Sequence, residues 1–453
     1  MLLMMATALM VVACAGVEDV VRTPDDTRPA EPQTVSFGAY VNRSTTRGGY
    51  QGTLTTSTLQ DGAGGFGVFA YYTDNHLYNR MSLPNFMYNQ QVTWNSETNR
   101  WEYTPVKYWP NETGISAQSE GVDYLSFFAY APFTEVNNAT GCATSSSKTG
   151  IMELSRSIDT GDPLVRYYAS MKPAEAVDLC WAAPHLNETK PDVDTKVTFD
   201  FHHALSALNV QIDTDVDEVS HDGTNDVDSQ TRIYVRSITF RGFAERGQLN
   251  LNNEETTPRW NSLDCDCDLS SDPITIYDGR RDGREGASAS LNELRTALNP
   301  DIVQSGLYTV TPGDPDVFAS TTPGVTNTVV NLFDVTGVAG DDAAKLAAPI
   351  YVLPTNEEMY VTIVYDVETY DPKLTSQYLS DGRTHGSTIE NSISAYIKNG
   401  SSENIIMQAG KQYNIRLHLG MTSVKVDASV TKWPAPATVP GEGGDNANVQ
   451  LPN

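Results

Sequence analysis

The chain is dominated by short segments in which apolar and polar side chains alternate. Alternation with a period of two is typical of a β-strand that buries one of its faces. The clearest such segments are residues 359–367, 412–419 and 424–433. Clusters of glycine, proline, asparagine and aspartate separate many of the segments, as turns between strands require. The pattern predicts an all-β fold built from sandwiches of short strands.

Further strands are predicted earlier in the chain. They cover residues 35–41, 67–72, 86–94, 101–103, 125–131, 197–201, 208–212, 233–240 and 349–354. Residues 204–208 lie between two of these strands and indicate either a bulge or a crossing between sheets. One short helix is predicted at residues 287–298, where Leu291, Leu294 and Leu298 have helical spacing.

The strands divide into two predicted β-sandwich domains, at residues 35–195 and 196–433. A chain of 453 residues is long enough for two or three domains with sizeable cores. The boundary is placed near the end of residues 138–190, which are irregular. Residues 15–34 and 434–453 are rich in residues that disfavour a packed core and are predicted to be a flexible tether and a flexible tail.

The first residues have the features of an export signal. Residues 1–13 form an apolar run that is too short to span a membrane, which takes roughly 20 residues. The length of the run and its small-residue end are typical of a signal peptide. The run ends in Val-Val-Ala-Cys, which is similar to a bacterial lipobox, so Cys14 is the predicted lipidation site and lipid of the outer membrane a predicted partner. The basic residues usual at the start of a signal peptide are missing, so the true start codon remains open. A signal peptide that carries no lipid is the alternative to lipidation at Cys14.

The first predicted strand follows the tether. Its alternating positions are Val35, Phe37, Ala39 and Val41. Arg43 and Arg47 come directly after it, and Arg47 is followed by two glycines, which give the exposed and flexible backbone that a protease needs. One interpretation is a strand followed by a turn. The other is a strand that is cut from the chain after Arg43 or Arg47.

The charge balance argues against one class of partner. The chain has 57 acidic and 30 basic residues, and its net charge is −27. Such a surface repels a phosphate backbone, so no nucleic-acid partner is predicted. The acidic residues are spread along the chain, as on a solvated exterior.

The chain has five cysteines. If Cys14 carries lipid, four remain, which are Cys142, Cys180, Cys265 and Cys267. An even number in an exported chain permits two disulfides, but the sequence leaves their pairing open. Cys265 and Cys267 have no second Cys/His pair nearby and make a poor zinc site.

Other motifs lack the context that their chemistry needs. Residues 62–67 satisfy G-x-G-x-x-G, but β-rich sequence follows where a dinucleotide fold has a helix. His202 and His203 have no nucleophile or acid motif nearby and are interpreted as structural. Residues 213–228 begin like a calcium loop but lack its glycine and its final glutamate. We therefore predict no catalytic residue, no metal and no cofactor, and the chain is predicted not to be an enzyme.

Three tryptophans leave two interpretations open. The predicted hairpin contains Trp94 and Trp101, and Trp109 follows it. Exposed aromatic rings could stack on sugars, whereas buried rings would pack in the core.

Several segments together resemble one family. They are Trp94, Trp101, Tyr-Trp-Pro at 108–110, Phe-Phe-Ala-Tyr-Ala-Pro at 127–132, Phe-His-His-Ala-Leu-Ser-Ala-Leu at 201–208, Tyr-Val-Leu-Pro at 351–354 and Gln-Ala-Gly-Lys-Gln-Tyr-Asn-Ile at 408–415. Their order, with the lipobox before them, is similar to that of the Bacteroidota fimbrillins of the Mfa-like and FimA-like type, whose members are lipoprotein precursors of pilus subunits.

The resemblance implies two transthyretin-like β-sandwich domains in tandem, with short helical insertions, and assembly with other fimbrial subunits into adhesive pili on the cell surface. It also implies that an arginine-specific protease removes the leader and first strand, here after Arg43 or Arg47, and that a donor strand from another subunit replaces the strand. The donor would come from the C-terminal region, which here is short and polar after Trp433, as expected of a tip or accessory subunit. The alternative is a surface lipoprotein that does not polymerise and binds a glycan or a host protein.

Overall fold

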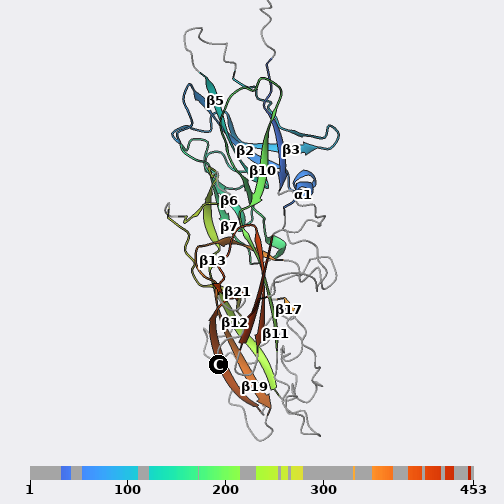
Figure 1. Ribbon diagram of the computed structural model, residues 1–453, viewed down its shortest axis with the longest axis vertical. Coiled ribbons are helices and arrows are strands. Elements are labelled where there is room, and N and C mark those ends of the chain that lie inside the picture. The colour runs from blue at the N-terminus through green and yellow to red at the C-terminus, as the bar shows by residue number, and fades with distance from the viewer. Residues whose placement is uncertain are drawn as a thin grey trace, which may run out of the picture.

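The structure is a computed structural model of the chain. It describes residues 32–41, 54–110, 122–171, 173–214, 231–253, 257–263, 267–278, 330–331, 349–370, 386–399, 403–419, 424–432 and 447–449. Nearly all of the regular secondary structure in the described part is strand, so the predicted all-β fold class is confirmed. Its sheets follow one another along an elongated molecule (Figure 1). Among the described residues, no helix has the length and apolarity needed to cross a membrane.

The upper end of the molecule in Figure 1 contains an eight-stranded sheet. Its order is β1 (Ser36–Val41), β10 (Lys196–His203), β8 (Cys180–Ala182), β5 (Asp123–Ala131), β2 (Phe66–Asp74), β3 (Met87–Asn95) and β4 (Arg100–Glu102), and β9 (His185–Glu188) also pairs with β5. The strands β3 and β4 form the hairpin that the sequence predicts. One face of the sheet curls around an apolar cluster that includes Phe37, Phe66 and Phe127.

The other face of this sheet packs on a second sheet. The second sheet consists of β15 (Trp260–Asn261), β14 (Arg246–Asn250), β7 (Leu164–Tyr168) and β6 (Gly150–Leu154). Between the two sheets lies a cluster of large buried side chains that includes Tyr71, Tyr130 and Tyr167. The strands β14 and β15 come from beyond the predicted boundary at residues 195 and 196, so the chain crosses that boundary and returns. A 3-10 turn, η1 (Pro173–Glu175), follows β7.

The lower part of the molecule is a sandwich of two further sheets. One sheet has the order β13 (Phe243–Ala244), β18 (Ile350–Pro354), β11 (Ser206–Thr214), β23 (Lys411–Leu419), β24 (Val424–Lys432) and β25 (Ala447–Val449), with β17 (Val330–Asn331) also on β11. The other consists of β16 (Ile274–Asp278), β12 (Thr231–Arg241), β19 (Tyr360–Tyr370) and β20 (Gly386–Tyr396). A third apolar cluster fills the space between them. A small hairpin, β21 (Lys398–Asn399) and β22 (Glu403–Asn404), follows β20.

The chain passes from one sandwich to the other between β10 and β11. Ala204 and Leu205 at this crossing are fully buried. The Ala204 amide donates to the carbonyl of Leu179 at 2.8 Å, and the Leu205 carbonyl accepts from the amide of Gly410 at 2.9 Å. Each bond ties the crossing to one of the two sandwiches. Of the two alternatives for residues 204–208, the crossing between sheets is the one observed.

The described helix α1 (Thr56–Asp61) is not among the predicted elements. Threonine and serine have low helix propensity, which hides the helix in the sequence. Thr55 and Thr58 form a reciprocal capping box, in which each side chain accepts from the other's backbone amide. Leu59 is fully buried and anchors the helix in the core. The predicted helix at 287–298 lies outside the described residues.

Candidate functional site: the groove that holds the first strand

Strand β1 pairs with β10 on one side, and the residues just before it are hydrogen-bonded on the other side. It runs parallel to β10, with Ser36 opposite Lys196 and Val41 opposite Phe201. At its start, the Val35 amide donates to the carbonyl of Lys107 at 2.9 Å. The Trp109 amide likewise donates to the carbonyl of Gln33 at 2.9 Å. The first strand therefore fills a groove between β10 and the segment that follows β4.

The side chains of β1 enter the core in the predicted alternation. Val35, Phe37 and Val41 are buried, and Ala39 is partly buried against the same cluster. The ring of Phe37 contacts four aromatic rings, at centroid distances of 5.3 to 6.5 Å. These rings belong to Phe66, Tyr103, Phe127 and Phe199. The predicted strand at 35–41 is confirmed, and Phe37 is its central anchor.

The end of β1 is held by helix α1. The Val41 amide donates to Oγ1 of Thr56 at 2.9 Å, and this hydroxyl lies 3.3 Å from the Val41 carbonyl. Arg43 and Arg47, the predicted cleavage positions, lie outside the described residues, as does Cys14. The last described contact of β1 thus comes two residues before Arg43.

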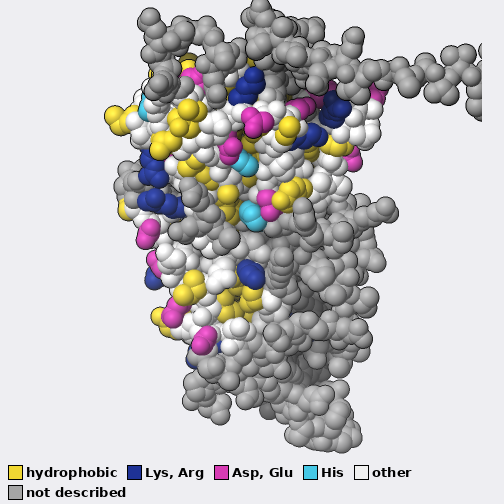
Figure 2. Space-filling model, turned by 45° about the horizontal axis from the view of Figure 1, so that its top comes forward, with side chains coloured by type: hydrophobic (Ala, Val, Ile, Leu, Met, Phe, Trp, Pro, Cys, Tyr) yellow, Lys and Arg dark blue, Asp and Glu magenta, His cyan; other side chains and the backbone are white. Residues whose placement is uncertain are grey.

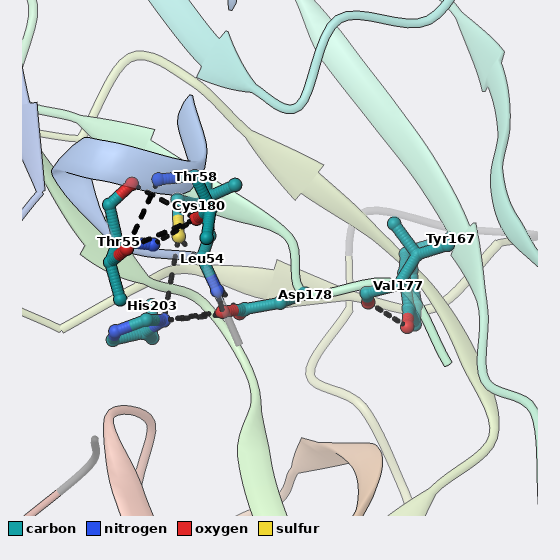
Figure 3. Close-up of polar contacts among 8 residues, drawn as sticks. All are labelled: Leu54, Thr55, Thr58, Tyr167, Val177, Asp178, Cys180 and His203. Carbon is teal, nitrogen blue, oxygen red and sulfur yellow. Dashed lines mark hydrogen bonds and ion pairs between the residues drawn. The ribbon is translucent and has the colours of Figure 1, made fainter. Parts of the chain in front are cut away.

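A second cluster of chemically active side chains lies at the end of β10, where this strand pairs with β8 (Figure 3). His203 Nδ1 is 2.9 Å and 3.1 Å from the two carboxylate oxygens of Asp178. It is also 3.5 Å from Sγ of Cys180. The three residues are 1%, 4% and 0% exposed, respectively. The sequence gives no sign that Asp178 and Cys180 lie beside His203, because it is the pairing of β8 with β10 that brings them together.

This cluster is not arranged as a nucleophile and its base. In a Ser/His/Asp or Cys/His/Asp triad the acid and the nucleophile contact different ring nitrogens of histidine. Here Asp178 and Cys180 both contact Nδ1 of His203. Burial, with a smaller contribution from the charge of Asp178, also raises the pKa of the Cys180 thiol well above its ordinary value, so that the reactive thiolate is disfavoured.

The described cysteines differ in their burial and in whether they form a disulfide. Cys142 is an exposed free thiol, and Cys180 is a buried free thiol. Cys267 is disulfide-bonded. Cys265 lies outside the described residues.

The glycine-rich segment at 62–67 has no dinucleotide-binding context. Gly64 and Gly65 have φ angles of +69° and +80° and turn the chain from α1 into β2. A helix therefore precedes the glycines and a strand follows them, which is the reverse of the order in a dinucleotide fold. The predicted calcium-like loop at 213–228 lies for the most part outside the described residues.

The tryptophans pack in the core. Trp101 and Trp109 are buried, and Trp94 is partly buried with its ring centroid 5.3 Å from that of Trp101. Of the two open interpretations, core packing is the one observed for Trp101 and Trp109. On the surface in Figure 2, hydrophobic side chains lie in several separate patches among acidic and basic ones.

Comparison with known proteins decides the family. Residues 52–278 match the model of the fimbrillin-like family, which is half of the chain. The chain belongs to the fimbrillin-like family. The family resemblance stated from the sequence is therefore confirmed. Because the family is one of fimbrial proteins and not of enzymes, the prediction that this chain is not an enzyme is also confirmed.

Several proteins to which the chain is similar have names that describe fimbrial proteins. Over 135 residues the fimbrillin-like chain is 33% identical to the fimbrium subunit Fim1C of Phocaeicola vulgatus, a match that covers 29% of this chain and 30% of that relative. A fimbrial protein from Bacteroides vulgatus is similar in structure, with a TM-score of 0.49 and 20% identity over 88% of this chain and 99% of that one. The fimbrial anchor protein Mfa2 of Porphyromonas gingivalis has a TM-score of 0.29 and 8% identity over 89% and 98%.

Proposed function

We propose that this fimbrillin-like chain is a structural or adhesive subunit of a cell-surface fimbria that gives up its first strand and accepts a strand from another subunit. The observation that carries the proposal is the position of β1. It is paired at its start on one side and along its length on the other, and it places Phe37 in a ring of four aromatic side chains. The contacts that hold β1 in this position are hydrogen bonds and packing, which can be exchanged for those of another strand.

Loss of β1 would leave an unfilled groove beside β10. The edge of β10 would expose backbone amides and carbonyls that are now paired over six residues. The pockets of Val35, Phe37 and Val41 would be open at the same time. An extended segment with apolar side chains at alternate positions satisfies both needs at once, which is the physical basis of strand addition.

The proposed processing begins at the membrane. The precursor is exported as a lipoprotein anchored at Cys14 in the outer membrane, and an arginine-specific protease cuts after Arg43 or Arg47. Either cut separates β1 and the lipid from the rest of the chain, because both arginines follow β1 in the sequence. The cleaved subunit then leaves the membrane for the fimbria, and its partners are other fimbrial subunits.

A tip or accessory position is proposed from the composition of residues 434–453. This segment is largely polar, and near its end only Val449 and Leu451 alternate as the apolar positions of a donor strand would. We infer that this subunit accepts a strand and does not donate one.

The proposal is tested by cutting the purified precursor with an arginine-specific protease. The expected product begins at Ser44 or Gly48 and forms ladders that resist mild denaturant. An Arg43→Lys/Arg47→Lys variant serves as the matched control and should keep β1 attached and remain monomeric. If the cut protein stays monomeric while the wild-type lipid anchor persists on cells, the alternative gains support, namely a surface lipoprotein that binds a glycan or a host protein without polymerising.

A further inference from the structure

Three side chains that can bind a metal meet on one face of the eight-stranded sheet. Cys180 and His203 are directly opposite each other in the antiparallel pairing of β8 with β10. Side chains of such a pair lie on the same face, close enough to share a ligand. Asp178 is two residues before Cys180, and residues two apart in an extended segment also share a face. The local backbone thus places a carboxylate, a thiol and an imidazole together.

We propose that Asp178, Cys180 and His203 bind a single divalent transition-metal cation of the zinc type. The three ligand atoms would be a carboxylate oxygen, Sγ and Nδ1. These atoms lie within 4.8 Å of one another, and the residues are buried. A thiolate, an imidazole and a carboxylate form the donor set that zinc prefers over magnesium or calcium, which take oxygen ligands.

The distances between the ligand atoms fit such an ion. Zinc bonds of about 2.0 to 2.3 Å in tetrahedral geometry place two ligand atoms about 3.3 to 3.5 Å apart. Nδ1 of His203 is 3.5 Å from Sγ of Cys180 and 3.1 Å from Oδ1 of Asp178. Sγ of Cys180 is 3.9 Å from Oδ1 of Asp178. Shifts of a few tenths of an ångström would bring all three atoms onto one tetrahedron.

The three groups lie close enough to share one cation. Nδ1 of His203 faces both oxygens of Asp178 and the sulfur of Cys180, and the Cys180 thiol faces Oδ1 of Asp178. A cation at the centre of the three atoms interacts with all of them. When it binds, the protons on Nδ1 and on Sγ leave these atoms, because only the unprotonated forms are ligands.

Hydrogen bonds from neighbouring residues hold the Asp178 carboxylate and its segment in place. The amide of Leu54 donates to Oδ2 of Asp178 at 2.5 Å, as neighbours of a metal ligand commonly do. The hydroxyl of Tyr167 donates to the carbonyl of Val177 and so holds the segment that carries Asp178. Water would complete the coordination, since three protein ligands leave a fourth tetrahedral position. The cation would join β8 to β10, the strand against which β1 lies.

The test is a titration of the full chain, after treatment with a chelator, with cobalt(II) alone. Cobalt bound to a thiolate gives a sulfur-to-metal absorption band in the near ultraviolet. We expect one equivalent of cobalt to saturate the band, and zinc to displace cobalt and to raise the melting temperature of the chain. In Cys180→Ser the band should be lost. In Cys142→Ser, which removes the exposed free thiol, it should remain.

The proposal is overturned if the folded wild-type chain shows no such band and no change in melting temperature with zinc. It is also overturned if the band persists in Cys180→Ser, which would place the metal at another cysteine. Circular dichroism of each chelated protein verifies that it is folded. A His203→Gln variant provides a second check, with a loss of zinc affinity of at least about tenfold expected for a lost ligand.

Discussion

The ring of Phe37 stacks on the ring of Phe199, with centroids 5.9 Å apart and planes inclined by 27°. Phe37 is 1% exposed although it belongs to a strand at the end of its sheet. The contact joins the strand that we propose is removed to the strand that remains. The stability of the uncut precursor therefore depends on a side chain that the mature subunit has to replace.

Replacing Phe37 with alanine should destabilise the uncut chain by about 3 kcal/mol or more, because it leaves a cavity among four rings. Denaturant unfolding of the precursor measures the change. Val106→Ala is the control, since Val106 is 50% exposed and its loss should change the free energy of unfolding by less than about 0.5 kcal/mol. After cleavage, the Phe37→Ala chain should polymerise as wild type does, because the altered residue is gone. Equal effects of the two substitutions on the precursor would contradict the assignment of Phe37 as the anchor.

Replacing Asp178 with alanine should cost about 3 to 5 kcal/mol in chelated protein, because it leaves the buried His203 without its carboxylate and removes the acceptor of the Leu54 amide. The matched control is Glu153→Ala. Glu153 pairs with Arg166 at 2.8 Å on the surface, where such a pair contributes about 0 to 1 kcal/mol. Urea unfolding at neutral pH compares the two. Similar small losses would show that the Asp178–His203 pair contributes little to stability.

The stability of the chain should fall at alkaline pH. Burial raises the pKa of Tyr413 to about 12, although the hydrogen bond from the Gln408 amide lowers it in part. Burial likewise raises the pKa of Tyr365 to about 12. The unfolded chain loses these protons near the ordinary value of 10.0 and the folded chain near 12, so the stabilisation is complete below pH 10 and is lost as the pH rises from 10 to 12.

Denaturant unfolding at a series of pH values between 9 and about 12 measures this slope. Tyr413→Phe keeps the ring but has no proton to lose, so its stability should fall less steeply over the same range. Tyr40→Phe serves as the control, since Tyr40 is only partly buried. An identical slope in wild type and Tyr413→Phe would contradict the assignment.

Elements with a strong period of two could be predicted from the sequence. In β19, Val361, Ile363 and Tyr365 alternate with polar or less buried residues and are buried in the structure as expected. The same holds for Phe37 and Val41 of β1 and for Val35 just before it. In each case burial of one face of a pleated strand is a local consequence of side-chain order.

Features that depend on capping or on distant pairing could not be predicted. Helix α1 begins with residues of low helix propensity and owes its start to side-chain hydrogen bonds between Thr55 and Thr58. His203 appears structural in the sequence, because its partners Asp178 and Cys180 precede it by 25 and 23 residues. Only the register of β8 on β10 brings them together. A sequence shows the spacing of Asp178 and Cys180 but not which strand lies opposite.

In the proposed assembly, β1 has to leave its groove before a strand of another subunit can bind there. Gly38 lies opposite Thr198 in the pairing of β1 with β10, and a Cβ added to Gly38 would be 3.5 Å from the Cβ of Thr198. This is within the Cβ–Cβ range of a disulfide, about 3.5 to 4.5 Å. A Gly38→Cys/Thr198→Cys variant should therefore form a disulfide that holds β1 in its groove.

The decisive measurement compares polymer formation by this variant after arginine-specific cleavage, with and without reductant. The oxidised protein should retain the β1 peptide in its intact mass and remain monomeric. Reduction should release the peptide and permit polymers. The single Thr198→Cys variant should polymerise in both conditions. Polymerisation of the oxidised double variant, with β1 still attached, would show that β1 does not have to leave.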